Sequence, residues 1–301
     1  MSVTGFGEGV MAKEDCARMY RNTMKRFPKF LNKVETKGGD LYYKKMDFED
    51  AFNKGFKYLE GDEAITNQHD MDLFVQDNIG IKVPLDGPQW RVWFTPLIDE
   101  DGKTYTVQIW KSHHSFMDGV SCMGVTCTMM EEYNLSYFVK FTPVPLLQQI
   151  LLKLSVIIYI PALFADSVFT MRDKNCITMG KKKMNGVICA SSSSCISMKA
   201  IKDLSKKAGC TVNDILMSAT SAAFKSYFRL RGDKLGSVPD HHKDSMMNAL
   251  MPANIRFEMY PTREAVRMEN CFAALPMRIP LVSTMKEAYK PISKVTKKIK
   301  S

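Results

Sequence analysis

The sequence predicts a mixed α/β fold, because segments with the spacing of strands alternate with segments that have the spacing of helices. Residues 90–94 and 104–110 are rich in aromatic and β-branched side chains, and a turn at 99–102 joins them. This pattern predicts a hairpin with a loop longer than two residues. Apolar residues with helical spacing follow in 197–208 and in 211–231.

The segments before the hairpin have weaker patterns. Residues 15–34 have a helical pattern that Pro28 interrupts, and residues 40–56 mix strand-like with charged pieces. Alternation and turn residues in 67–84 predict short strands separated by turns. Residues 120–133, after the hairpin, are compatible with a helix.

Residues 146–165 form the most apolar stretch of the chain. A membrane-spanning helix needs about 20 mainly apolar residues. This stretch reaches that length, but it contains Gln148, Gln149, Lys153 and Pro161. Three interpretations stay open: a spanning helix, an amphipathic helix at a membrane surface, and a helix buried between domains. The basic surplus of the chain favours contact with a membrane over none.

A polar, lysine-bearing segment ends in four serines at 191–194, and its composition is that of a linker. The predicted organisation is therefore an N-terminal domain over 1–142 and an apolar helix with its linker over 143–194. A C-terminal domain follows over 195–301, and its last segment, from Thr284, has a helical pattern.

The composition is that of a globular protein, with 301 residues, 45% hydrophobic and 25% charged. The formal net charge of +10 predicts an anionic partner. Aromatic residues do not interleave the lysine runs, so we do not expect nucleic acid as that partner. The eight cysteines include no CxxC pair, and the N-terminus has no apolar signal core. These features predict a protein with reduced cysteines that faces the cytosol.

Several chemistries lack their sequence motifs. The chain contains no P-loop, no GxGxxG fingerprint and no GxSxG elbow. Its cysteines and histidines do not have zinc spacing. We therefore expect neither a metal nor a bound cofactor.

The segment His113-His114-Ser115-Phe116-Met117-Asp118-Gly119 stands between the predicted strand 104–110 and the helix-compatible segment 120–133. A neutral imidazole is the usual general base near neutral pH, and its second nitrogen needs a partner that fixes its orientation. The plain alternative is that both histidines are ordinary polar residues at the end of a strand.

This segment has the form HHxxxDG, which resembles the signature of the wax ester synthase/acyl-CoA:diacylglycerol acyltransferase family. That family belongs to the chloramphenicol acetyltransferase-like superfamily of CoA-dependent acyltransferases. Further segments resemble family motifs in the same order: Pro88-Gln89-Trp90, with Gln89 where leucine is usual, Thr211-Val212-Asn213-Asp214, Pro252-Ala253-Asn254-Ile255-Arg256 and Asn270-Cys271-Phe272-Ala273-Ala274-Leu275-Pro276.

The resemblance implies an α/β fold of two sandwich-like domains with mixed sheets. Because family members usually run well beyond this length, it also implies that the second domain is incomplete. The implied activity is O-acyl transfer from acyl-CoA, as co-substrate, to a fatty alcohol or to diacylglycerol. The implied location is the cytosolic face of a membrane, in a eukaryote the endoplasmic reticulum or a lipid droplet.

The resemblance also implies roles for single residues. His114 is the base that takes the proton of the alcohol, and His113 shapes the site. Asp118 orients the loop through an ion pair with an arginine, and Gly119 leaves room where the substrates meet. Asn213 positions the histidine or polarises the thioester carbonyl. Supporting roles are implied for Pro88, Trp90, Asp214, Asn254, Arg256 and Asn270.

Two alternatives remain beside this interpretation. The first is a non-catalytic lipid-binding or scaffold relative that keeps the fold. The second is an amine-acylating or peptide-bond-forming enzyme of the same superfamily, which a panel of acceptors would separate from an O-acyltransferase.

Overall fold

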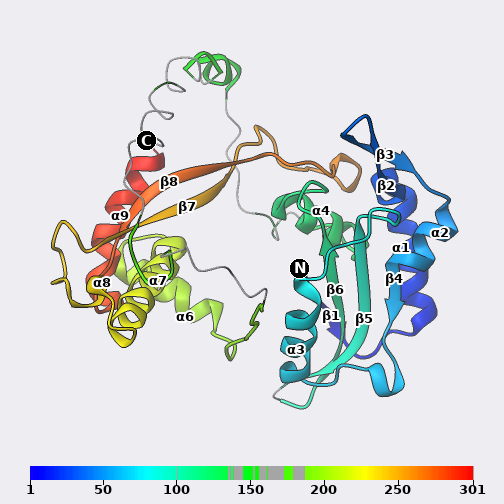
Figure 1. Ribbon diagram of the computed structural model, residues 1–301, viewed down its shortest axis with the longest axis horizontal. Coiled ribbons are helices and arrows are strands. Elements are labelled where there is room, and N and C mark those ends of the chain that lie inside the picture. Colours follow the sequence, from blue (N-terminus) through cyan, green and yellow to red (C-terminus); the bar gives the residue numbers. More distant parts are fainter. Residues whose placement is uncertain are drawn as a thin grey trace. The chain divides into compact units, whose positions relative to one another are not determined.

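The computed structural model describes residues 1–99, 101–134, 136, 138, 145–151, 153–155, 161, 173–178 and 187–300. The chain divides into two compact units, and Figure 1 shows their elements. Unit 1 comprises Met1–Pro143, Asn185–Ser193 and Arg256–Phe272, and unit 2 comprises Val144–Met184, Ser194–Ile255 and Ala273–Ser301. Each unit therefore combines segments that are far apart in the sequence.

Unit 1 is built on a four-stranded sheet in the order β1-β6-β5-β4. The strands are β1 (Ser2–Glu8), β4 (Phe56–Tyr58), β5 (Trp90–Ile98) and β6 (Thr104–Ser112). β6 pairs antiparallel with both β1 and β5, whereas β4 is parallel to β5. The hairpin predicted from the alternation is therefore confirmed as β5 and β6.

One face of this sheet is covered by α1 (Lys13–Arg26), the 3-10 helix η1 (Pro28–Leu31), α2 (Phe48–Gly55) and α4 (Gly119–Met129). Trp90, Val92 and Phe94 of β5 point into this layer with Trp110 of β6, as the two-residue period of a strand requires. Helix α1 ends before Pro28, where the sequence predicted the interruption.

The opposite face of the sheet packs against α3 (Gln68–Ile79), and Figure 1 shows α1 and α3 on different sides of the strands. The prediction of short strands over 67–84 is wrong. Asn67 caps the helix by accepting a hydrogen bond from Asp70 N. Met71, Phe74 and Val75 then lie three and four residues apart and pack on the sheet, so helical burial prevails over the local alternation.

A second, two-stranded antiparallel sheet in unit 1 consists of β2 (Asn32–Lys37) and β3 (Asp40–Lys45). Gly38 and Gly39 join these strands with φ of 64° and 91°. A two-residue hairpin loop with both φ values positive fits the right-handed twist of strands, and glycine takes it without strain. This hairpin presents Tyr43 beside the loop with the two histidines. Two short 3-10 helices, η2 (Gly61–Glu63) and η4 (Arg263–Ala265), complete the unit.

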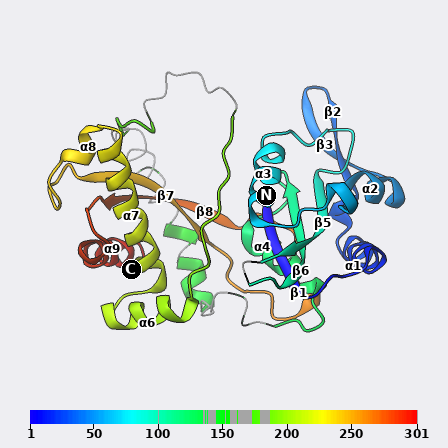
Figure 2. The same cartoon turned by 90° about the horizontal axis from the view of Figure 1, so that it is seen from below.

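Unit 2 contains α6 (Met198–Ala208), α7 (Val212–Leu230), α8 (Lys234–Ser237) and α9 (Met285–Lys300). A two-stranded sheet of β7 (Met246–Asn254) and β8 (Phe272–Pro280) accompanies them, and Phe272 itself belongs to unit 1. Helices α7 and α9 lie side by side in both cartoon views (Figures 1 and 2).

The start of α7 has the capping box that the sequence predicted. The Thr211 side chain accepts from Asp214 N, and the Asp214 carboxylate accepts from Thr211 N. The second oxygen of Asp214 accepts a hydrogen bond from Thr296 Oγ1 of α9 at 2.6 Å. Asp214 thus ties α7 to α9 and is itself almost fully buried.

Part of the apolar stretch 146–165 is described, namely residues 146–151, 153–155 and 161. Residues 146–151 and 153–155 are helical, and Leu146, Leu147, Leu151 and Leu154 are each more than half exposed. The rest of the stretch lies outside the described residues. Within the described part of the chain, no helix has the length and apolar character that crossing a membrane requires.

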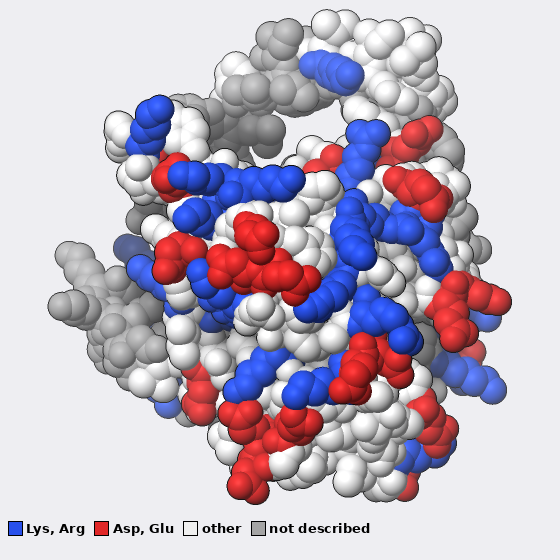
Figure 3. Space-filling view, turned by 90° about the vertical axis from the view of Figure 1, so that its right-hand side faces the viewer, with Lys and Arg blue, Asp and Glu red and all other residues white. Residues whose placement is uncertain are grey.

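The face of the molecule in Figure 3 carries acidic side chains interspersed among the basic ones. Within unit 1, basic and acidic side chains form exposed ion pairs, such as Lys13–Glu60, Arg21–Glu49 and Lys57–Glu63. Pairs of this kind contribute about 0–1 kcal/mol each. The positive surplus of the chain is therefore not concentrated on this face.

Candidate active site

The two histidines lie on a short loop of unit 1 between the end of β6 and the start of α4. His113 N donates a hydrogen bond to Gln89 O at 3.2 Å, and Phe116 N donates to His113 O at 2.9 Å. Phe116 and Met117 are buried in the core, whereas His113 and His114 are exposed. The buried pair anchors the loop and leaves both imidazole rings at the surface of the unit.

Asp118 ends this loop and caps α4. Its Oδ1 accepts from Ser121 N at 2.9 Å, and its Oδ2 accepts from Cys271 N at 2.7 Å. Arg256 Nη2 lies 2.8 Å from the same Oδ2, and both side chains are buried, with 5% of Asp118 and 3% of Arg256 exposed. The carboxylate of Asp118 therefore joins the loop to two later segments of unit 1.

The guanidinium of Arg256 makes further hydrogen bonds in this buried cluster. Its Nε donates to Tyr260 Oη at 3.0 Å, and Nη2 donates to Ser121 Oγ at 2.9 Å. Glu269 accepts through its backbone oxygen from Asp118 N at 3.1 Å, and its Oε1 lies 3.4 Å from Arg256 Nε. A buried charge pair is stable only when its other polar atoms are hydrogen-bonded, as they are in this cluster.

The same contacts shift both ionisation equilibria. Burial alone would raise the pKa of Asp118, but the hydrogen bonds of Ser121 N, Cys271 N and Arg256 prevail and hold this pKa below its usual range. Burial alone would lower the pKa of Arg256, yet its bonds to Asp118 and Tyr260 raise it. Both shifts keep the pair charged near neutral pH.

Lys29, in η1, supports the loop from the side of the core. Its Nζ donates to Phe116 O at 2.5 Å, to Ser115 O at 3.3 Å and to Met268 O at 3.3 Å. Burial lowers the pKa of this ammonium group. One side chain thus joins the histidine loop to the segment that precedes Glu269.

His113 is oriented by its own loop. Ser115 N donates to His113 Nδ1 at 3.2 Å, and Ser115 Oγ lies 2.7 Å from the same nitrogen. Because a backbone N–H only donates, Nδ1 acts as an acceptor, and the neutral ring carries its proton on Nε2. Tyr43 Oη of β3 lies 3.1 Å from Ser115 Oγ and extends the chain of polar contacts.

His114 has a different environment. Its ring is exposed and lies 5.4 Å from the ring of Phe272, measured between centroids, at an interplanar angle of 57°. It has no hydrogen bond with any residue in the described part of the chain. A Cβ built on Gly119, the first residue of α4, would meet no described atom within 4 Å.

Pro88 and Trp90 are both buried at the start of β5. Trp90 Nε1 donates to Phe30 O at 2.8 Å, and its ring belongs to the core of unit 1. The amide of Gln89 donates to Pro84 O and to Gly87 O, both at 3.0 Å, and holds the turn before the strand. Trp90 lies in the same core cluster as Phe116 of the histidine loop, and His113 N donates to Gln89 O. The supporting roles predicted for Pro88 and Trp90 stay predictions. Asn270, exposed between Glu269 and Cys271, lies on the same supporting segment.

The remaining predicted residues lie in unit 2. Asn213 is exposed on the first turn of α7, and its Nδ2 lies 3.7 Å from Met217 Sδ. Asp214 is held in the capping box, and Asn254 is exposed at the end of β7. Unit 1 therefore brings together the histidine loop, Asp118 and Arg256. The residues of the predicted ND motif belong to the other unit, and their roles stay predictions.

The sequence did not single out four members of the cluster, namely Lys29, Ser121, Tyr260 and Glu269. Ser121 follows the capping residue Asp118 by three positions, and this spacing only weakly indicates that the backbone of Ser121 bonds to the cap. Lys29 and Tyr260 had no signal, because Lys29 contacts Phe116 of the loop and Tyr260 contacts Ser121 of α4 across more than 80 positions in the sequence.

No family model matches the chain, and no curated protein sequence matches it. Solved structures resemble it at low identity. The first condensation domain of the CDA synthetase has a TM-score of 0.56 at 12% identity, with 98% of this chain and 68% of that one covered. The wax ester synthase/diacylglycerol acyltransferase from Marinobacter aquaeolei VT8 has a TM-score of 0.55 at 17% identity, with 99% and 66% covered. The SgcC5 protein from Streptomyces globisporus has a TM-score of 0.50 at 10% identity, with 97% and 64% covered.

The chain has the α/β fold that condensation domains share with chloramphenicol acetyltransferase-like acyltransferases, as the sequence predicted. It spans about two thirds of the length of the structures it resembles. At these identities the similarity shows the fold, and the activity has to be argued from the site.

Proposed function

We propose that this chain is an acyl-CoA-dependent O-acyltransferase. It moves a long-chain acyl group to a fatty alcohol or to diacylglycerol, with His114 as general base. The observation that carries the proposal is the loop itself: His114 is exposed on a segment that the buried Asp118–Arg256 ion pair closes at its end. The ion pair fixes the end of the loop from which the His114 ring projects, and a fixed point of attachment favours general-base catalysis.

The reaction needs one proton acceptor and no covalent enzyme intermediate. The alcohol oxygen attacks the thioester carbonyl carbon while a ring nitrogen of His114 takes the alcohol proton. A C–O bond forms, the C–S bond breaks, and the proton passes from the imidazolium to the departing CoA thiolate. His114 is then neutral again, and the products are an ester and free CoA.

Asp118 has a positioning role in this proposal. Its two carboxylate oxygens are occupied by Ser121 N, Cys271 N and Arg256 within the core. It therefore fixes the end of the loop and does not reach the substrate. His113, with its proton on Nε2, has that N–H as a donor for a polar group near the base.

Two alternatives to O-acylation stay open, one catalytic and one non-catalytic. The condensation domains among the similar structures favour an amine acceptor, which the same base would serve by taking the proton of the amine. The ring of His114 has no orienting hydrogen bond within the described part of the chain, and this favours a non-catalytic lipid-binding relative.

The test incubates the full chain, in membrane-containing expression material, with labelled palmitoyl-CoA and one of several acceptors: hexadecanol, diacylglycerol or a long-chain amine. The proposal predicts labelled ester with at least one alcohol and little amide. Amide as the main product supports the amine acceptor. No acyl product with any acceptor contradicts catalysis and supports the non-catalytic relative.

The same proposal includes a membrane surface on the cytosolic side, where long-chain alcohols and diacylglycerol reside. Its support is the helical part of the apolar stretch, where Leu146, Leu147, Leu151 and Leu154 are exposed. Exposed leucines along one short helix are typical of interfacial binding, in which the apolar face enters the acyl boundary.

A further inference from the structure

Unit 2 contains a cavity of about 320 Å³ that the proposed acyl transfer does not use. Residues 208–210, at the end of α6, form one wall. The other wall is a face of α9, with Tyr289, Lys290, Ser293, Lys294 and Lys297. All of these residues belong to unit 2.

Three lysines give this cavity a positive charge. Lys290, Lys294 and Lys297 follow one another at spacings of four and three, so they lie on one face of α9. None of their ammonium groups has a hydrogen bond or an ion pair with any residue that the structure describes. The sequence of α9 contains six lysines and a single acidic residue, Glu287.

Such a row of cations is unfavourable in an isolated protein. Like charges four residues apart on a helix repel each other and destabilise it. An anion between them would remove this repulsion, and lysine ammonium groups bind phosphate as compact point charges.

Ser293 gives the same cavity a second, independent polar feature. Its side chain is 7% exposed, and its Oγ is a buried hydroxyl with no hydrogen-bond partner among the described residues. A buried hydroxyl without a partner is destabilising, and such groups are rare in native structures. A phosphate oxygen in the cavity would accept this hydrogen bond after a rotation about χ1.

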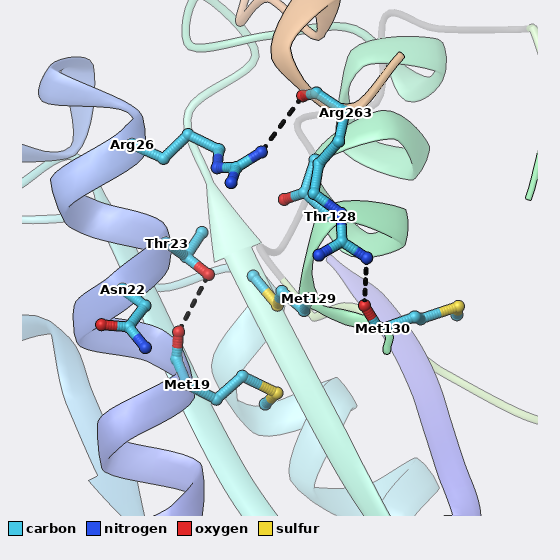
Figure 4. Close-up of a pocket in the computed structure, with 8 residues that line it drawn as sticks. All are labelled: Met19, Asn22, Thr23, Arg26, Thr128, Met129, Met130 and Arg263. Carbon is cyan, nitrogen blue, oxygen red and sulfur yellow. Dashed lines mark hydrogen bonds between the residues drawn. The ribbon is translucent and has the colours of Figure 1, made fainter. Parts of the chain in front are cut away.

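A second cavity, of about 370 Å³ in unit 1, is lined by two arginines, Arg26 and Arg263, and serves as a comparison (Figure 4). Arg263 Nη2 donates to Met130 O and Glu131 O, both at 2.7 Å. Arg26 Nη1 donates to Arg263 O at 3.3 Å and lies 3.9 Å from Glu264. Both guanidinium groups there already bond to backbone carbonyls of the protein, whereas the lysines of α9 do not.

We propose that the cavity between the end of α6 and α9 binds the phosphate group of a phosphomonoester. Lys290, Lys294 and Lys297 supply the charge, and Ser293 supplies a hydroxyl donor. The volume exceeds that of one phosphate and leaves room for an organic substituent beside Tyr289. Its source is either a soluble metabolite or a lipid headgroup. The proposal does not depend on His114 acting as a base.

The test measures ligand binding by the full chain without any activity assay. Thermal unfolding is followed with inorganic phosphate and with glycerol 3-phosphate, each compared with sodium chloride at equal ionic strength. A ligand that binds only the native state raises the unfolding temperature, and the rise grows with the logarithm of ligand concentration once that concentration exceeds the dissociation constant. Sedimentation with phosphatidylcholine vesicles, with and without phosphatidic acid, tests the lipid source.

Three variants assign the binding to this cavity. Lys294→Gln/Lys297→Gln should weaken phosphate binding by about tenfold or more, because two charge-assisted contacts are lost. Lys286→Gln, on the same helix outside the cavity, should leave binding unchanged. Ser293→Ala should weaken binding without lowering the unfolding temperature of the free protein, because its hydroxyl bonds no described residue.

The results distinguish a soluble ligand from a lipid headgroup, and one set of results overturns the proposal. A specific shift with glycerol 3-phosphate supports a soluble ligand, and binding only to vesicles that contain phosphatidic acid supports a headgroup. In both cases the double lysine variant has to lose the effect. The proposal is overturned if phosphate and glycerol 3-phosphate act no more strongly than chloride and phosphatidic acid does not increase binding to vesicles, or if the double variant responds like the wild-type protein.

Discussion

Replacing Arg256 with methionine gives the sharpest test of how the histidine loop is held. Methionine keeps much of the apolar volume and removes the charge. The change breaks the 2.8 Å ion pair with Asp118 and the bonds to Tyr260 and Ser121, all inside the core. It leaves the Asp118 carboxylate buried without its counter-charge.

The magnitude follows from that buried charge. Removing one partner of a buried ion pair costs about 3–5 kcal/mol. The lower end, about 3 kcal/mol, applies here because Ser121 N and Cys271 N still donate to Asp118. The matched control is Arg18→Met, which breaks an exposed pair with Asp15 and should cost less than about 1 kcal/mol.

Urea unfolding followed by tryptophan fluorescence measures this loss. All three tryptophans, Trp90, Trp93 and Trp110, lie in unit 1, so the signal reports the unit that contains the ion pair. The reasoning is refuted if Arg256→Met destabilises unit 1 no more than Arg18→Met does.

The loss should also depend on pH. The pKa of Asp118 is below its usual value of 3.8 in the folded protein, so the pair stabilises the fold above about pH 4. This contribution disappears as the pH falls through the folded pKa and the carboxylate takes up a proton. Without Arg256 the pKa of Asp118 in the folded variant is higher than in the wild-type protein. The gap in stability between the two proteins should therefore be largest near neutral pH and shrink in acid, as the carboxylate of the variant takes up its proton first. A gap that widens in acid would contradict this sign.

Three further predictions concern other parts of the chain. Lys29→Met should lower the free energy of unfolding of unit 1 by about 1–3 kcal/mol, measured in urea, because three backbone carbonyls lose their donor. The control is Lys25→Met, a change of an exposed side chain on α1, which should leave this free energy unchanged. Gly55→Ala should destabilise unit 1 by about 1–3 kcal/mol, because the new Cβ would lie 2.2 Å from the buried ring of Trp90; an unchanged urea midpoint would show that the ring moves aside freely. Leu147→Gln/Leu151→Gln should reduce co-flotation with anionic vesicles, whereas the exposed Leu41→Gln on β3 should not; equal flotation of all three proteins would argue against the apolar helix as the membrane contact.

Local patterns predicted the hairpin and the helices whose ends carry strong signals. The alternation in β5 and β6 decides which side chains face the core, and the capping box at Thr211 begins α7. The same local logic failed for α3, because its apolar residues are few and only the sheet beneath them decides between a helix and strands.

In the candidate site, too, some residues could be predicted from the sequence and others could not. The contiguous segment His113–Gly119 singled out the histidine loop, and the family resemblance implied that Asp118 pairs with an arginine. It did not show that Lys29 supports the loop or that Tyr260 and Glu269 complete the arginine's bonds. Those contacts join segments that only the folded unit brings together, and the sequence around each of them resembles any polar surface segment.

The proposed role of His114 as the base of an acyl transfer is tested by comparing reaction rates. Initial rates of ester formation from labelled palmitoyl-CoA are compared for wild-type protein, His114→Ala and His69→Ala, an exposed histidine on α3 that serves as control. General-base catalysis predicts a loss of about 100-fold to 10,000-fold for His114→Ala, with His69→Ala and the urea midpoints unchanged. Ester formation at the wild-type rate by His114→Ala would contradict the claim.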